Sequence, residues 1–142
     1  MPQKWLLPVD GSEASLHAVR QAIEEAASAT SRPDLLLVNV QAPVSGDVSR
    51  FVNAETLKEF HAENGAEALA GARALLDASG LPYASRVLVG EAAPVIADLA
   101  ARESCTRIVM GARGLGSVLG MLMGSVTTKV VHLSPVPVLL VK

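Results

Sequence analysis

Several features that would direct a protein to a particular partner or compartment are scarce in this chain. It contains one cysteine, Cys105, so no disulfide can form within the chain, and this fits a reducing compartment. Because this thiol follows a predicted helix, a structural, half-buried role is favoured over a reactive one. The formal net charge is −2 and the basic residues form no tract, which argues against nucleic acid as the main partner.

Long apolar runs and leader-like segments are missing as well. The longest uncharged stretch, residues 114–128, is too short and too rich in glycine to span a bilayer, which needs about 20 residues. Residues 1–5 lead directly into a short apolar segment without a signal-peptide pattern. We therefore expect a cytoplasmic protein with no membrane partner.

What the chain does have is enough apolar sequence for one globular domain. Half of its 142 residues are apolar and 18% are charged, so residues 1–142 are expected to form a single domain around one core. Short apolar runs, typical of buried strands, recur along the chain. They are residues 5–9, 35–40, 85–89, 107–110 and 136–141.

Helical spacing of apolar residues separates these runs. Ser12 is the expected N-cap of a first helix that reaches about Ala29. A second helix is predicted over Ala54–Ser79, with its apolar face formed by Leu57, Phe60, Leu69, Ala72 and Leu76. Two more helices follow, one with Pro94 in its first turn and one over residues 126–133, whereas residues 41–52 are expected to form a loop.

Strands that alternate with helices predict a parallel α/β sheet with helices on both faces, because such crossovers are right-handed. Ligands bind such sheets beyond the carboxyl ends of the strands. Three segments meet at that edge: residues 8–11, Val40 with Gln41, and residues 111–125. We expect them to converge on one crevice.

The last of these segments carries the pattern G-x-x-G-x(9)-G-S, formed by Gly111, Gly114, Gly124 and Ser125. Glycines at a strand end let backbone N–H groups approach an anion, and a following helix N-terminus adds unpaired donors. A flexible, glycine-rich surface loop is the alternative. The position of the glycines, on both flanks of the loop, favours anion binding.

The sequence contains few residues or motifs that could support catalysis. The loop lacks the lysine of a P-loop, and no H-E-x-x-H, C-x-x-C or G-x-S-x-G motif occurs. His17, His61 and His132 fall in predicted helices, where surface or packing roles are favoured. Asp10 is the one candidate general base at the crevice, so efficient turnover is not expected and no catalytic residue is assigned.

On these residues the whole chain resembles the universal stress protein family, in its ATP-binding branch. The resemblance rests on residues 7–12 (LPVDGS), the step from Gly90 to Pro94, the complete glycine loop, and residues 135–141 (PVPVLLV). It implies a Rossmann-like five-stranded sheet in the order 3-2-1-4-5. It also implies a homodimer through the C-terminal strand Val138–Val141, which would otherwise leave an apolar edge exposed; coverage by the chain's own helices is the alternative.

The resemblance further implies ATP as the ligand, with Mg²⁺ as an optional companion. Adenine and ribose would lie near Pro8, Val9, Asp10 and Val40. The phosphates would follow the loop, along Gly111, Arg113, Gly114, Gly124, Ser125 and Val126. Met110, at the end of the fourth strand, is also counted among the nucleotide-binding residues. Asp10 is alternatively a turn carboxylate, and Arg113 a solvated loop residue.

One departure from the family concerns residues 115–123, which carry no charge where many relatives have a lysine or arginine. Triphosphate binding would then depend on backbone amides and a metal ion, and the choice among ATP, ADP and AMP stays open. The apolar side chains of this spacer could instead cover the core or meet a partner. The preferred function is an ATP-dependent stress-response regulator with an unidentified protein partner. The alternatives are a slow ATPase or nucleotide hydrolase, and a nucleotide-independent dimeric scaffold.

Overall fold

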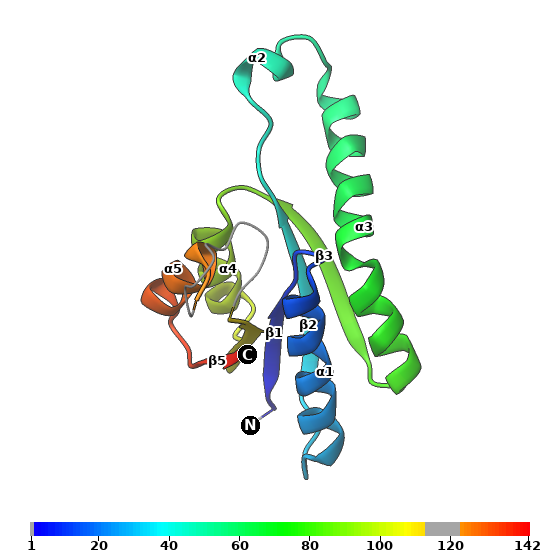
Figure 1. The fold of residues 1–142 in the computed structure, drawn as a ribbon, viewed down its shortest axis with the longest axis vertical. Helices are drawn as coiled ribbons and strands as arrows, with labels where there is room; N and C mark the ends of the chain where they lie inside the picture. The colour runs from blue at the N-terminus through cyan, green and yellow to red at the C-terminus, as the bar shows by residue number, and fades with distance from the viewer. Residues whose placement is uncertain (1, 113–122) are drawn as a thin grey trace.

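The computed structural model describes residues 2–112 and 123–142, in which five parallel strands form one sheet (Figure 1). The strand order is β3-β2-β1-β4-β5, which confirms the predicted 3-2-1-4-5 arrangement. The strands are β1 (Lys4–Pro8), β2 (Asp34–Gln41), β3 (Tyr83–Val89), β4 (Arg107–Gly111) and β5 (Val138–Val141). Strands β2 and β3 are added on one side of β1, and β4 and β5 on the other, so the strand order reverses between β1 and β4. Ligands bind at this point in folds of this kind.

Helices cover both faces of the sheet. They are α1 (Glu13–Ser28), α2 (Gly46–Ser49), α3 (Ala54–Ser79), α4 (Ala92–Arg102) and α5 (Ser125–Leu133). In Figure 1, α1 and α3 lie on one side of the sheet and α4 and α5 on the other. No helix of the described residues is both long and apolar enough to cross a bilayer.

Two buried clusters, one on each face, hold these layers together. Strand β2 contributes to both, because Leu35 and Leu37 point toward α1 and α3, whereas Leu36 and Val38 point toward α4 and α5. A strand covered on both faces needs apolar side chains at every position, which is why residues 35–38 are uninterrupted leucine and valine.

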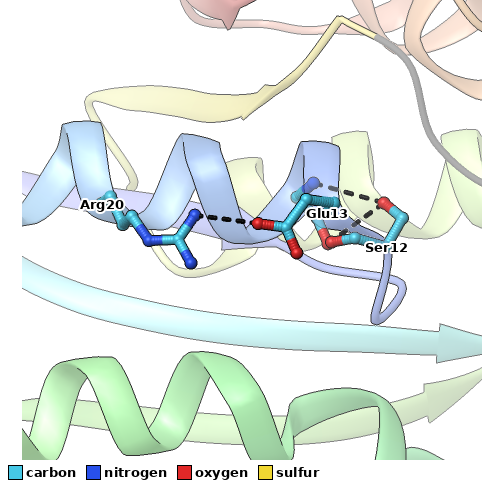
Figure 2. Close-up of polar contacts among 4 residues, drawn as sticks. Ser12, Glu13 and Arg20 are labelled. Atoms are coloured by element: carbon cyan, nitrogen blue, oxygen red, sulfur yellow. Dashed lines mark hydrogen bonds and ion pairs between the residues drawn. The ribbon is translucent and has the colours of Figure 1, made fainter.

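The start of α1 is fixed by its N-cap, as the sequence predicts. The hydroxyl of Ser12 accepts the backbone N–H of Ser15 at 3.2 Å (Figure 2). The Ser15 hydroxyl donates back to the Ser12 carbonyl at 2.9 Å. Glu13, in the first turn, pairs with Arg20 at 3.2 Å. This exposed ion pair contributes little to stability, so the serine cap determines where the helix begins.

Two expectations about residues 41–61 were wrong. The predicted loop contains a short helix, α2, whose N-cap Ser45 accepts the N–H of Val48. Phe60 does not belong to the buried face of α3, because it is 49% exposed, whereas its neighbour His61 is buried. The buried face passes through His61, Gly65, Leu69, Ala72 and Leu76, one helical turn apart, and Phe60 lies about 100° away from it. In Figure 1, α2 and the start of α3 project beyond the end of the sheet.

Candidate functional site

A cavity of about 390 Å³ opens at the carboxyl edge of β1, β2 and β4, beside the N-termini of α4 and α5. Its volume is in the range of small-molecule sites. The predicted site residues that the structure describes all line it: Pro8, Val9, Asp10, Val40, Met110, Gly111, Gly124, Ser125 and Val126. Arg113 and Gly114 lie outside the described residues. The structure thus gathers three distant segments around one cavity, and their role in holding a ligand stays a prediction.

Several lining residues were not predicted from the sequence. They include Ser15 from α1, Asn39 from β2, Ala92 and Ile96 from α4, and Thr127 from α5. Asn39 had a signal, because it is the one polar residue among residues 35–40. The others required knowledge of which helix ends reach the edge of the sheet.

Asp10 sits in the turn between β1 and α1. Its carboxylate oxygen Oδ1 accepts the backbone N–H of Ser12 at 2.9 Å. The backbone N–H of Asp10 donates to the Ser15 hydroxyl at 3.4 Å. Gly11 has φ of +85°, a conformation that favours glycine and lets the chain turn directly into α1. Asp10 therefore does serve as a turn carboxylate, the alternative raised by its sequence position, and it lines the cavity as well.

Asn39 is 4% exposed, and both ends of its carboxamide are engaged. Its Nδ2 donates to the carbonyl of Val9 at 2.8 Å, and its Oδ1 accepts from Nε2 of Gln41 at 2.6 Å. The backbone carbonyl of Gln41 in turn accepts the N–H of Gly90, at the end of β3. This chain of hydrogen bonds joins the ends of three strands at the wall of the cavity.

The N-terminus of α5 faces the cavity with its first turn, Ser125 to Thr127. Its N-cap is Gly124, which has no side chain that could cap the helix. The free N–H groups of a helix start and the positive end of its dipole favour an anion. The buried hydroxyl of Thr127 donates to the carbonyl of Gly111 at 3.1 Å, and the N–H of Gly124 donates to the carbonyl of Ala112 at 2.8 Å. These bonds fix α5 against the end of β4.

Formal charge is scarce around the cavity. Among the lining residues that the structure describes, Asp10 is the single ionisable side chain. Lys129, the first cation after Arg113, instead lies 3.7 Å from Glu91 in an exposed ion pair. Within residues 2–112 and 123–142, no group of three histidine, cysteine, aspartate or glutamate side chains could hold a metal ion.

The three histidines lie on helices away from this lining. His61 is buried, and among the residues that the structure describes its Nδ1 has no hydrogen-bond partner. Its ring meets that of Phe60 edge-on, with the ring centroids 5.4 Å apart. Its position on the inner face of α3 assigns it to packing, in line with the sequence analysis.

Comparison with known proteins places the chain in a family. The family model described as "Universal stress protein family" matches residues 1–142. A universal stress protein of Thermus aquaticus is 37% identical over 138 residues, covering 96% of each chain. The solved structure of the hypothetical protein MJ0577 superimposes with a TM-score of 0.84 at 26% identity, over 100% of this chain and 96% of that one.

A further solved structure is a universal stress protein in complex with cAMP. It matches with a TM-score of 0.72 and 28% identity, over 99% of this chain and 97% of that one. The expected resemblance is therefore confirmed over the full length described: the chain belongs to the universal stress protein family.

Proposed function

We propose that this protein binds an adenine nucleotide, with ATP as the principal ligand, and that occupancy regulates its contacts with partners during stress. The single observation that carries the proposal is that the N-terminus of α5, whose N-cap is a glycine, lines a cavity of about 390 Å³. Such a cavity offers an apolar wall for a base and backbone donors for phosphates. The relative bound to cAMP, at 28% identity, supports the same ligand class.

The base would lie at the end of β2. Val40 lines the cavity beyond the last residue pair of β1 with β2, which is Pro8 with Val38. Its backbone can therefore offer one donor and one acceptor to the edge of adenine. Pro8, Val9 and Met110 supply apolar contact, and Asp10 can accept from ribose hydroxyls.

The phosphates would lie at the first turn of α5, against the N–H groups of Ser125 and Val126 and the hydroxyl of Ser125. Gly111 and Gly124 keep this part of the wall open, and Arg113 and Gly114 complete the proposed set. A Mg²⁺ ion fits this donor set only in part, because Asp10 is the single carboxylate of the described lining. Magnesium commonly binds nucleotide sites through one or two carboxylates and the phosphates, so Asp10 would hold it, with the nucleotide supplying the other oxygens and the ion neutralising phosphate charge.

A binding role is favoured over efficient turnover. Phosphoryl transfer needs a positioned base or water together with charge stabilisation, and Asp10 already supports the turn into α1 through Ser12. We further propose a single cytoplasmic domain that forms a homodimer. The order of the sheet puts β5 at its edge, and the residues of β5 are only partly buried. A second copy of β5 would cover this edge.

The direct test is to denature freshly purified protein and identify released nucleotides by mass spectrometry, followed by calorimetric titration with ATP, ADP and AMP. About one nucleotide per chain, or saturable ATP binding, is the expected result. An empty protein that binds none of the three would refute nucleotide binding and favour the dimeric scaffold. Sedimentation of the same sample tests the dimer separately, and Leu139→Lys, which puts a charge on β5, should yield monomers.

Slow hydrolysis is the second candidate, and the position of Asp10 in the cavity is the observation that favours it. Steady release of ADP that disappears in Asp10→Asn would support an enzyme. Turnover no faster than in a heat-denatured control, at saturating ATP and Mg²⁺, would exclude it and leave the binding role.

A further inference from the structure

The hydrogen bonds that link Gln41, Asn39 and Val9 lie at the end of β2, where the base of the proposed nucleotide would bind. Strand β2 is three residues longer than its pairing with β1, which ends at Pro8 and Val38, whereas its pairing with β3 continues to Gln41 and Val89. Residues 39–41 are therefore held by their pairing with β3, and two of them, Asn39 and Val40, line the cavity.

Backbone groups of successive strand residues point to opposite sides. The carbonyl of Val38 faces β1, because it accepts the N–H of Val9 at 2.9 Å. The carbonyl of Gln41 faces β3, because it accepts the N–H of Gly90 at 2.9 Å. By this alternation the N–H and C=O of Val40 face the β1 side, beyond the point where the ladder has ended.

In a continuing parallel ladder the Val40 N–H would bond to the carbonyl of Val9. That carbonyl instead accepts the side chain of Asn39 at 2.8 Å. Because a carbonyl can only accept, Nδ2 must be the atom that points to it, and Oδ1 must point away. Gln41 fixes the same orientation by donating its Nε2 to Oδ1 at 2.6 Å.

We propose that Asn39, oriented by Gln41, is a positioning residue for adenine: it takes the Val9 carbonyl and so leaves the N–H and C=O of Val40 for the base. This inference rests on the proposed nucleotide binding and adds to it the basis of base selectivity. A donor beside an acceptor matches N1 and the N6 amino group of adenine. Guanine presents the reverse pattern at these positions, an N1–H donor and an O6 acceptor, so a base held in one orientation is discriminated.

The first test is independent of any ligand and measures amide hydrogen exchange by NMR in the full chain. In the wild-type protein the Val40 amide should exchange rapidly, whereas the Leu36 amide, inside the β1–β2 ladder, should be protected. In Asn39→Asp the carboxylate cannot donate to Val9, so the Val40 N–H should bond to the Val9 carbonyl and become protected. A Val40 amide as protected as Leu36 in the wild type would overturn the proposal.

The second test compares ATP with GTP by calorimetric titration, because the two ligands differ only in the base. Asn39→Asp should weaken ATP binding by about tenfold, the effect of one hydrogen bond, and leave GTP binding nearly unchanged. Gln41→Leu, which avoids a buried charge, should shift the ratio of the two affinities in the same direction, and Gln21→Leu on α1 serves as the matched control. Equal losses for ATP and GTP, or no loss for either, would overturn the role in selectivity.

The two readouts separate the possible failures. If the exchange pattern holds but the wild-type protein binds neither ATP nor GTP, nucleotide binding and adenine selectivity are both refuted, and only the arrangement of the strand ends stands. If ATP binds but the Val40 amide is protected in the wild type, the proposed function stands and this inference fails.

Discussion

The carbonyl oxygen of Ala14 in α1 lies 2.7 Å from the position that a Cβ atom on Gly111 would occupy, and the Ala14 carbonyl carbon lies 2.9 Å from it. Both neighbours are backbone atoms, which cannot move aside as a flexible side chain can. Gly111 was predicted to give a phosphate room to approach. The structure shows that it also lets the first turn of α1 approach the end of β4, where both elements border the cavity.

Gly111→Ala should therefore lower the free energy of unfolding, by about 1–3 kcal/mol as for other overpacked sites. The measurement is denaturation in urea. Gly46→Ala is the control, because no atom lies within 4 Å of the added Cβ, and alanine in the first turn of α2 should be neutral or slightly stabilising. If Gly111→Ala were as stable as the wild type, the prediction would be wrong, because α1 could then move away from β4 at no cost in free energy.

Gly65→Ala should be destabilising for a related reason. Its Cβ would lie 2.4 Å from Cγ1 and 2.5 Å from Cγ2 of Val87 in β3, and valine has little rotamer freedom. The clash should outweigh the gain in helix propensity of about 1 kcal/mol. Gly71→Ala, whose Cβ meets only the end of the flexible Leu16 side chain at 3.0 Å, should cost less.

A double-mutant cycle tests this contact directly. Gly65→Ala should cost less in a Val87→Ala background than in the wild type, with a coupling of about 1 kcal/mol. Additive effects would show that the loss arises elsewhere than between α3 and β3. Urea denaturation of the four proteins supplies all the values needed.

The contact of Gly65 with Val87 also explains where sequence reasoning about α3 failed. Leu69, Ala72 and Leu76 were correctly assigned to the buried face, but hydropathy then selected Phe60 rather than His61 and Gly65. The helix approaches β3 so closely that glycine is required, and hydropathy gives no weight to a glycine. The short helix α2 was missed because four residues with no buried side chain provide no periodicity.

The crevice was easier to predict than its details. Carboxyl ends of parallel strands meet at one edge whatever the packing, so Asp10, Val40 and Gly111 could be brought together from strand order and position. The role of Asn39 could not, because its partner Val9 lies 30 residues away and the bond depends on where β1 leaves the sheet. Local pattern identifies the elements, whereas side-chain contacts between elements require the fold.

Cys105 should react slowly with thiol reagents. Burial raises the pKa of its thiol, and the nearby Glu103 carboxylate acts in the same direction, although the Lys4 ammonium opposes it. A raised pKa means less thiolate at a given pH, and thiolate is the reactive form. At pH 8 the folded protein should therefore react with a disulfide reagent far more slowly than the protein in denaturant, with Cys105→Ala as the blank. Equal rates in the two states would contradict a buried thiol.

The start of α5, with glycine as its N-cap, allows a prediction with opposite effects on stability and binding. Ser125 is the first residue of this helix and is exposed. Ser125→Asp puts a negative charge at the positive end of the helix dipole, so the free energy of unfolding should rise by about 0.3–1 kcal/mol. The same charge would repel a phosphate at that position, so ATP affinity should fall by more than about tenfold in calorimetric titration.

Ser125→Asn is the matched control, because it has nearly the same size and shape as aspartate without the charge. It should change ATP affinity by far less than Ser125→Asp does. Adenosine, which has no phosphate, should bind Ser125→Asp and the wild type alike, and this comparison separates charge repulsion from damage to the base end of the cavity. If Ser125→Asp bound ATP as tightly as the wild type, the phosphates would lie away from α5, and the anion site proposed at its N-terminus would be wrong.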